Sequence, residues 1–247
     1  MDRAFWITWY DLPDEGRAAY LDWLHNTYIP KVTARPGVLW AAHYASESNV
    51  APLGGGKGMV SSHVSGVPDG DRYILIFGAT NAHAFMHPAP GKYNASLPDA
   101  DRKMLALRRG ERVNIMLEEA TVLGPASGYM ALTPSAGIQL GSFNCANYTD
   151  EEEMAEWYAN DRFPSLEHVP GLIRARKLVS VAGWAKHACF YEFTSVEARN
   201  EHFVFYQKNN PQMEAESKRI VGKLVHAPKS SNLARRIWPP WPRRRAC

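Results

Sequence analysis

The chain has 247 residues, of which 45% are hydrophobic and 21% are charged, so it can bury one large core or two small ones. Its formal net charge is +3, and the three arginines at 243–245 account for all of it, which argues against a basic nucleic-acid-binding face. The start of the chain lacks a signal-peptide pattern, and no apolar run approaches the length of a membrane span, so we expect a cytoplasmic protein that contacts no membrane.

The first half reads as strand, helix, strand, strand, helix, strand. Its strands are expected at 5–10, 38–44, 73–79 and 112–122, where β-branched and aromatic residues predominate. Pro13 with two acidic residues after it is typical of a helix start, and the Pro-Gly pair at 36–37 ends that helix. A broken helical segment is expected over 81–109.

A long connection separates the second and third strands of this half. Residues 45–70 are rich in Gly, Ser and Pro and show neither strand nor helix periodicity, which predicts a loop. A connection of this length inside a compact domain is usually an active-site lid, a binding loop or a disordered segment.

The second half repeats the same plan. Its strands are expected at 137–147, 172–181, 187–193 and within 233–238. Thr149 and Glu152 predict a capping box before its first helix, and further helices are expected near 196–206 and 211–223. Three prolines after position 238 predict an extended arm at 239–247. Either Trp238 and Trp241 pack on a partner subunit or across the barrel mouth, or the last residues form a loose tail.

The two halves also share a sequence motif. Residues 23–41 align with 157–175 without a gap at a spacing of 134 positions, and residues 73–80 align with 187–194 at a spacing of 114. The difference of 20 residues corresponds to the insertion in the first half. This pattern predicts a duplicated unit, with one copy at 1–128 and the other at 129–247, and the period excludes solenoid repeats.

The βαββαβ order predicts an α+β protein made of two ferredoxin-like units. In each unit an antiparallel sheet carries both helices on one face. The other face of each sheet must also be buried, and two sheets in one chain can cover each other. We therefore expect the two antiparallel sheets to pack into a single α+β barrel.

The shared motif is W-x5-[IF]-P, five residues, Pro-Gly and then a strand. It resembles the signature of the dimeric α+β barrel superfamily, particularly the EthD-like and antibiotic-biosynthesis-monooxygenase-like branches, over most of both halves. Many relatives carry a histidine two residues before the motif proline, where this chain has Tyr28 and Arg162. The resemblance implies cofactor-free lyase, dehydratase, isomerase or monooxygenase chemistry, and a homodimer is one option.

Aromatic residues of the first half form a candidate pocket. Alternating residues of the first and second strands are expected to make an aromatic wall, which either lines a pocket for a small aromatic or hydrophobic substrate or fills the core. The second half has Arg174 and Arg176 where the wall has Trp40 and Ala42, so the pocket is expected in the first half. The predicted substrate contacts are Trp6, Thr8, Trp40, Tyr44, Phe77 and Phe85.

Five histidines of the first half are candidate proton carriers or structural residues. His83 and His87 are four positions apart, a spacing that could bind a metal on a helix but lacks a third ligand, so no metal is predicted. His43 lies on the strand face opposite Trp40, and either His25 or His43 could be structural. The predicted catalytic set is Tyr10, His25, Tyr28, His63, His83 and His87.

The polar residues of the second half have two interpretations. They could bind a carboxylate, or they could be structural, either forming salt bridges with Glu153, Glu156 or Glu167 or holding the two halves together. The residues concerned are Asn144, Arg162, Arg174, Arg176 and Lys177. The cysteines at 145, 189 and 247 lack metal-type spacing and are expected to be reduced thiols.

Missing motifs narrow the function further. No G-x-G-x-x-G follows a strand, the GGGKG at 54–58 lacks a phosphate-loop ending, and no G-x-S-x-G elbow occurs, so no cofactor is predicted. The leading hypothesis is a cofactor-independent lyase, dehydratase or isomerase that uses general acid/base catalysis. A cofactor-free monooxygenase of a phenol and a non-enzymatic binding or assembly protein remain as alternatives. Haem, found in the wider superfamily, would need a proximal histidine that the sequence does not single out.

Overall fold

The computed structural model describes residues 2–47, 66–203 and 211–240. Within these residues one antiparallel sheet contains nine strands, and eight of them close into a barrel because β5 pairs with both β7 and β9. The ninth, β8, pairs with the end of β5. The strands are β1 (Ala4–Asp11), β2 (Val38–Ser46), β3 (Tyr73–Ala79), β4 (Arg109–Leu123), β5 (Gly137–Cys145), β6 (Leu172–Ala182), β7 (His187–Phe193), β8 (Leu224–His226) and β9 (Asn232–Trp238).

The strand order is the same in the two halves. In the first half the order is β4-β1-β3-β2, and in the second half it is β9-β5-β7-β6. The halves meet where β4 pairs with β6 and where β2 pairs with β9. The predicted α+β class with a closed antiparallel barrel is therefore confirmed. The predicted boundary at residue 128 falls between β4 and β5, and as a domain boundary it stays a prediction.

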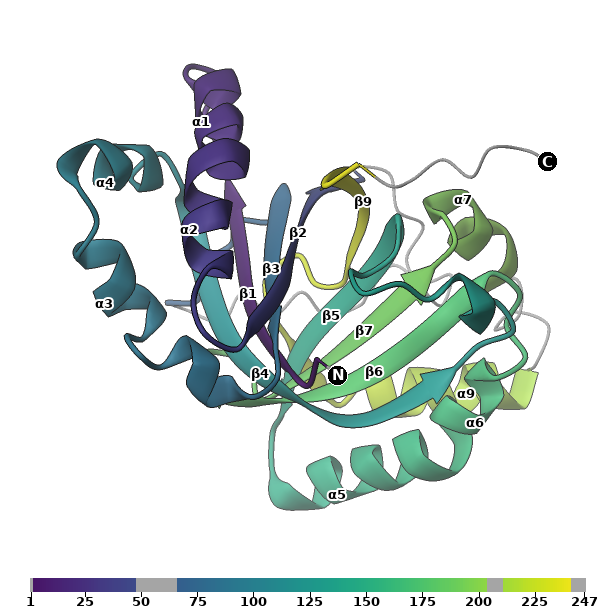
Figure 1. Ribbon diagram of the computed structural model, residues 1–247. Coiled ribbons are helices and arrows are strands. Elements are labelled where there is room, and N and C mark those ends of the chain that lie inside the picture. Colours follow the sequence, from purple (N-terminus) through teal and green to yellow (C-terminus); the bar gives the residue numbers. More distant parts are fainter. Residues whose placement is uncertain (1, 48–65, 204–210, 241–247) are drawn as a thin grey trace, which may run out of the picture.

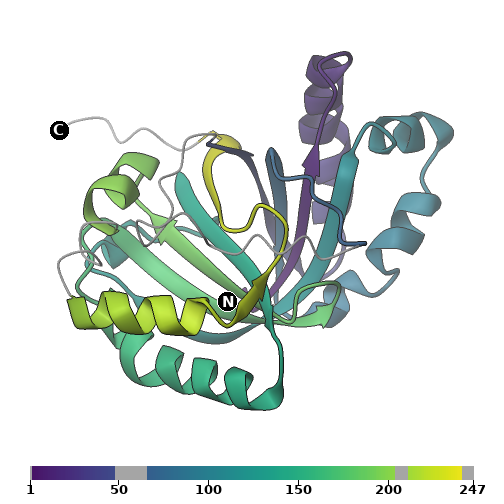
Figure 2. The same ribbon diagram turned by 180° about the vertical axis from the view of Figure 1, so that it is seen from behind.

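Short helices cover the outside of the barrel. Figures 1 and 2 show α1 to α4 on one flank and α5, α6 and α9 on another. The helices of the first half are α1 (Arg17–Trp23), η1 (Leu24–Tyr28), α2 (Ile29–Thr33), η2 (Ala82–Phe85), α3 (Pro90–Ala95) and α4 (Asp99–Leu105). Those that follow are η3 (Ser127–Tyr129), α5 (Tyr148–Trp157), η4 (Tyr158–Arg162), α6 (Phe163–Leu166), α7 (Val196–Ala198), η5 (Arg199–Phe203) and α9 (Pro211–Val221).

The barrel has three apolar cores, one inside it and one under each set of helices. The interior core draws on both halves, and Phe5, Trp9 and Trp40 meet Leu140 and Phe190 there. Burial of this surface is the main force that holds the two sheets together. Along each strand, residues that face the barrel interior alternate with residues that pack under the helices, because successive side chains of a strand point to opposite faces.

The repeated motif builds the same turn in both halves. Gly37 and Gly171 follow the helices with φ angles of +85° and +76°, which a residue with a side chain rarely adopts. A Cβ on Gly37 would lie 3.0 Å from Ala84 Cβ, and one on Gly171 would lie 2.8 Å from Ala198 Cβ. The motif proline stands in the first turn of both α2 and α6, so the shared residues report how a helix ends and a strand begins.

Two local predictions need correction, and one strand is additional to those predicted. The first helix begins at Arg17 rather than at Pro13, because Gly16 is left-handed with φ +77°. The first helix of the second half is capped by Asn147, which accepts from Asp150 N, and not by Thr149. Strand β8 was not predicted. Most of the insertion at 45–70 and residues 241–247 of the arm lie outside the described residues.

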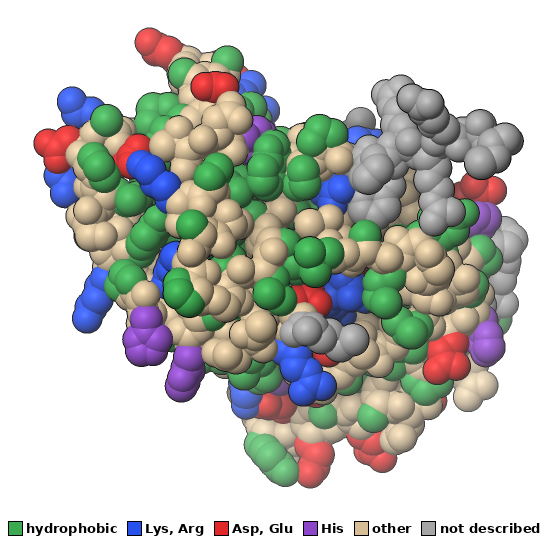
Figure 3. Space-filling model, in the orientation of Figure 1, with side chains coloured by type: hydrophobic (Ala, Val, Ile, Leu, Met, Phe, Trp, Pro, Cys, Tyr) green, Lys and Arg blue, Asp and Glu red, His purple; other side chains and the backbone are tan. Residues whose placement is uncertain are grey.

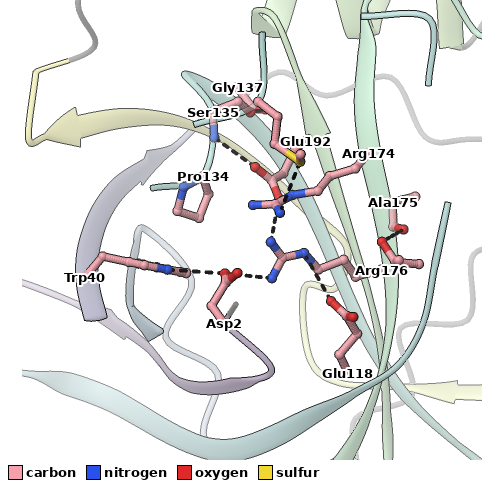
Figure 4. A network of polar contacts seen from close by, with 12 residues as sticks. Asp2, Trp40, Glu118, Pro134, Ser135, Gly137, Arg174, Ala175, Arg176 and Glu192 are labelled. Atoms are coloured by element: carbon pink, nitrogen blue, oxygen red, sulfur yellow. Dashed lines mark hydrogen bonds and ion pairs between the residues drawn. The ribbon is translucent and has the colours of Figure 1, made fainter. Parts of the chain in front are cut away.

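A buried polar network joins the two halves inside the barrel. Arg176 Nη1 donates to Asp2 Oδ2 at 2.9 Å, and the indole N–H of Trp40 donates to the same oxygen at 3.2 Å. Figure 4 shows the Arg176 guanidinium between Asp2 and Glu118, with Glu192 and its partner arginine beside it. The interpretation that the second-half arginines hold the halves together is thus confirmed for Arg176.

No helix among the described residues is long and apolar enough to cross a membrane. On the face drawn in Figure 3, acidic and basic side chains are interspersed and do not gather into a field of one sign.

Candidate active site

The predicted aromatic wall is divided between two faces of the sheet. Trp6 pairs with Phe77, which pairs with Ala41, so these residues share the face under the helices. Trp40 pairs with Gly78 and points into the barrel. The prediction of one wall is therefore wrong, because a shift of one residue in register exchanges the two faces of a strand. Tyr44 also faces the barrel, where its hydroxyl donates to Ser135 O.

The face under the helices carries a chain of three polar side chains. The hydroxyl of Tyr10 lies 2.9 Å from His43 Nε2, and His43 Nδ1 lies 2.9 Å from His25 Nε2. Tyr10 comes from β1, His43 from β2 and His25 from η1. Tyr10 and His43 are fully buried, whereas His25 is half-buried, so the chain runs from the core to the surface.

Burial sets the protonation of this chain. It lowers the pKa of His43 well below its ordinary value, and the nearby His25 and Arg108 lower it further. Burial also lowers the pKa of His25, against a smaller opposing effect of Asp22. The pKa of Tyr10 is raised well above its ordinary value, chiefly by burial. At neutral pH the two histidines are therefore uncharged and the phenol keeps its proton.

Arg108 lies beside the inner end of the chain. Its guanidinium carbon is 4.8 Å from the centre of the Tyr10 ring and 5.4 Å from that of Tyr28. Its Nε donates to Tyr20 OH and its Nη1 to Glu111 Oε1, both at 2.6 Å. Its Nη2 is buried and has no hydrogen-bond partner among the described residues. A positive charge next to the phenol favours any negative charge that forms there.

The outer end of the chain is edged by two half-buried aromatic rings. Trp238, the last residue of β9, stacks on His25 with ring centres 5.7 Å apart. Tyr73 stacks on His43 at 5.5 Å and on Tyr10 at 5.7 Å. Neither ring is fully buried.

Tyr28 lies under the helix end, as its position in the sequence predicts. Its hydroxyl donates to Asn94 Oδ1 at 2.7 Å, and its ring contacts that of Phe77. Burial raises the pKa of Tyr28, so it holds its proton at neutral pH. Phe85 packs against Trp6, and Thr8 accepts the indole N–H of Trp6 at 3.0 Å. These residues are core members by position, and their contact with a substrate stays a prediction.

The remaining predicted histidines are not part of the Tyr10–His43–His25 contacts. His83 lies in the 3-10 helix η2 and His87 lies beyond its end, so the expected single helical face is not formed. Both side chains are exposed. His63 lies outside the described residues.

The corresponding face of the second half contains different chemistry. Lys177 and Arg162 stand where the first half has His43 and Tyr28, and Lys177 Nζ donates to Glu119 at 2.6 Å. Arg162 is buried, with its guanidinium 5.1 Å from the ring of Phe203. A cavity of ≈240 Å³ opens next to it, lined by Trp157, Asp161, Arg162, Gln212, Met213 and Glu216. The pocket was expected in the first half, so this second-half cavity was not foreseen.

Neither haem nor a metal fits the described residues well. No histidine lines the second-half cavity, and facing ring nitrogens of His25 and His43 are engaged with each other. Within the described parts of the chain, no three His, Cys, Asp or Glu side chains are grouped to hold a metal ion. Cys145 and Cys189 are free thiols there.

The predicted catalytic set lacks two residues of this site. One is His43, and its place on the strand face opposite Trp40 is the sequence signal that could have identified it. The other is Arg108, which immediately precedes β4 and belongs to no motif, so only the folded structure brings it to Tyr10 on β1 and Tyr20 on α1. The structure joins Tyr10 and His25 of the predicted set through His43.

Comparisons with known proteins define the fold. No family model and no curated protein matches the chain. An anthrone oxidase-like protein of known structure is similar over 96% of this chain and 91% of its own, with a TM-score of 0.60 and 12% identity. A candidate monooxygenase from Fusobacterium nucleatum is similar over 96% of this chain and 93% of its own, with a TM-score of 0.57 and 9% identity. A candidate monooxygenase from Lactobacillus acidophilus is similar over 96% of this chain and 94% of its own, with a TM-score of 0.51 and 13% identity. The chain shares with these proteins the α+β fold built around an antiparallel barrel.

Proposed function

We propose that the protein is a cofactor-independent enzyme that removes a proton from a small aromatic or hydrophobic substrate. The observation that carries this proposal is the Tyr10–His43–His25 chain, in which two contacts of 2.9 Å join a buried phenol to a half-buried imidazole. A histidine that acts as a general base must be unprotonated at working pH and within reach of its substrate. His25 meets the first condition through its lowered pKa and the second through its exposure.

Each residue of the chain has a distinct role in this proposal. The substrate ring lies against Tyr73 and Trp238, and His25 takes its proton. For His25 to act as the base, its Nε2–H must donate to His43 Nδ1, which leaves the lone pair of His25 Nδ1 free to take the proton. Tyr10 in turn accepts from His43 Nε2–H and so fixes the tautomer of His43. Because burial, with smaller effects of His25 and Arg108, lowers the pKa of His43, the added proton stays on His25, from which it can be returned to the substrate.

The fate of the deprotonated substrate distinguishes two reactions. Return of the proton to another atom, or loss of a leaving group, gives the isomerase, dehydratase or lyase reaction. In the monooxygenase reaction, the deprotonated phenol transfers one electron to oxygen, the substrate radical and superoxide combine to a peroxide, and loss of water leaves a carbonyl, so that the substrate supplies all four electrons and the second oxygen atom leaves as water. The monooxygenase and oxidase names of the three similar structures favour this second candidate. Because the sequence identities are only 9–13%, these names guide the choice of the test and do not assign the reaction.

The test is turnover of a panel of phenols and hydroxylated aromatic acids with the full chain, in air and under nitrogen. His25→Asn is expected to lower kcat by roughly 10²- to 10⁴-fold, the usual contribution of a general base. His83→Asn, an exposed histidine of the same half, is the matched control and should retain full turnover. Full activity of His25→Asn would contradict the proposal.

Oxygen uptake separates the two reactions. Turnover that needs oxygen and consumes it supports the monooxygenase, whereas equal turnover under nitrogen supports the lyase or isomerase. Binding without turnover in either atmosphere would favour the non-enzymatic alternative.

We also propose that the chain is a tandem duplication within the dimeric α+β barrel superfamily, with each half a ferredoxin-like unit. The matching strand orders and the equivalent Gly37 and Gly171 turns support this proposal. Because one chain supplies both sheets, a second chain is not needed to close the barrel, and a homodimer would pair outer surfaces.

A further inference from the structure

The two ends of the barrel interior differ in how their buried arginines are neutralised. At one end Arg176 lies 2.9 Å from Asp2, 3.5 Å from Glu118 and 3.7 Å from Glu192 (Figure 4). Arg174 forms an ion pair with the same Glu192. Buried charges are costly unless opposite charges accompany them, and this end meets that condition.

Arg112 lies at the other end, inside the barrel. It stands near the start of β4, nine residues before Thr121, the partner of Arg176 in the β4–β6 register. Its Nη1 donates to Trp184 O and its Nη2 to Ser142 Oγ, both at 3.1 Å. Only 5% of its surface is exposed. Burial lowers the pKa of Arg112 to about 10, yet the guanidinium stays charged at neutral pH.

Arg112 has no acidic partner within residues 2–47, 66–203 and 211–240: none of the ion pairs there includes it. Instead its guanidinium carbon lies 3.8 Å from the centre of the Trp9 ring, the residue opposite it on β1. A stacked guanidinium keeps its edge free for hydrogen bonds in its own plane. Arg112 is therefore a buried cation that is held in place but not neutralised.

One further polar group beside Arg112 lacks a partner. The indole N–H of Trp9 is buried without a hydrogen bond among the described residues. Buried polar atoms are nearly always satisfied in folded proteins, so an exception needs an explanation. An anion would satisfy Arg112 and the indole N–H together.

We propose that the Arg112 end of the barrel interior binds a small carboxylate anion. One carboxylate accepts hydrogen bonds from the in-plane edge of the guanidinium and from the Trp9 indole N–H, and Ser142 lies next to it. A planar carboxylate fits the fork of a guanidinium better than a point charge does. This site is separate from the histidine chain, because Trp9 and Tyr10 are neighbours on β1 and point to opposite faces of the sheet.

The test is binding of acetate and benzoate to the full chain by calorimetry, together with thermal unfolding at constant ionic strength set with chloride. Both carboxylates should bind saturably and raise Tm. Arg112→Gln should weaken binding roughly tenfold or more, since a hydrogen bond to a charged group is lost. Arg109→Gln removes the same charge from an exposed position of β4 and should leave binding unchanged.

Each result bears on the proposal. No saturable binding to the wild type, or equal binding to Arg112→Gln, overturns it. A response to inorganic phosphate without a response to either carboxylate overturns the choice of carboxylate. Arg112→Lys keeps the charge without the fork, so it should fold and bind more weakly, and it decides the outcome if Arg112→Gln does not fold. The variant His25→Asn should bind carboxylate normally, which separates this site from the proposed catalysis.

Discussion

The hydroxyl of Tyr10 lies 2.9 Å from Nε2 of His43, although 33 positions separate the two residues in the chain. Strand β3 lies between their strands, and Tyr73 on it stacks on both rings. The other ring nitrogen of His43 contacts His25, which is half-buried. A phenol in the core is thus linked to an imidazole that solvent reaches, and several measurable properties depend on this link.

The first concerns stability and pH. The pKa values of His25 and His43 are lowered from an ordinary value of 6.5, chiefly by burial. As the pH falls below 6.5, the unfolded chain therefore takes up protons that the folded protein does not. The free energy of unfolding should be largest above this pH and decrease as the pH falls, as measured by urea unfolding between pH 8 and 5. His43→Gln should flatten the curve, and a variant with the slope of the wild type would contradict this assignment.

The second concerns the link itself. Tyr10→Phe removes the hydroxyl and leaves His43 Nε2 buried without its partner. The expected cost is about 1–3 kcal/mol in the free energy of unfolding. Urea unfolding measures it, and Tyr148→Phe is the control because Tyr148 is exposed and its hydroxyl contacts only Glu152 at the surface. Equal midpoints for the two variants would show that the Tyr10 contact contributes nothing.

The third concerns the network that joins the halves. Arg176→Met leaves Asp2 without its cation partner inside the barrel, and breaking such a buried pair should cost about 3–5 kcal/mol. Arg235→Met is the control, since Arg235 also links β9 to the first half but through the exposed Glu47. Its expected cost is below about 1 kcal/mol. Comparable losses in the two variants would argue against a special role for the buried network.

The fourth concerns the duplicated turn. Gly37→Ala and Gly171→Ala both place a Cβ within 3.0 Å of an alanine side chain at a positive φ, so each should destabilise the protein by more than about 1 kcal/mol. Gly91→Ala in α3 meets no atom within 4 Å and should be neutral or stabilising by up to about 1 kcal/mol. Thermal unfolding of the three variants measures these effects. Tolerance at only one of the two turns would mean that the halves are not equivalent there.

The sequence predicted the fold better than the site. Motif residues such as Pro30 and Gly37 act through local backbone geometry, which the sequence expresses directly, so strands and turns fell close to their expected places. The face of each strand depends instead on register. A shift between Val38 and Trp40 in the β2–β3 pairing accompanies the orientation of Trp40 into the barrel, and no local pattern announces it.

The chemistry of the site depends on contacts between distant segments. His43 has no distinctive neighbours in sequence, and its importance follows only from Tyr10 on one side and His25 on the other. Arg108 likewise meets Tyr20 across 88 positions. The mismatch of Trp40 and Arg174 is expected to mark a pocket in the first half. Instead Trp40 donates to Asp2 and Arg174 pairs with Glu192, and Arg176 links these two buried carboxylates inside the barrel.

Strand β9 lies between β2 and β5, and its last residue stacks on His25. During synthesis the first half leaves the ribosome before this strand does. Until β9 emerges, one edge of β2 therefore stays unpaired and His25 lacks the stacked ring of Trp238. The barrel can close, and the site can be completed, only after Trp238 has emerged.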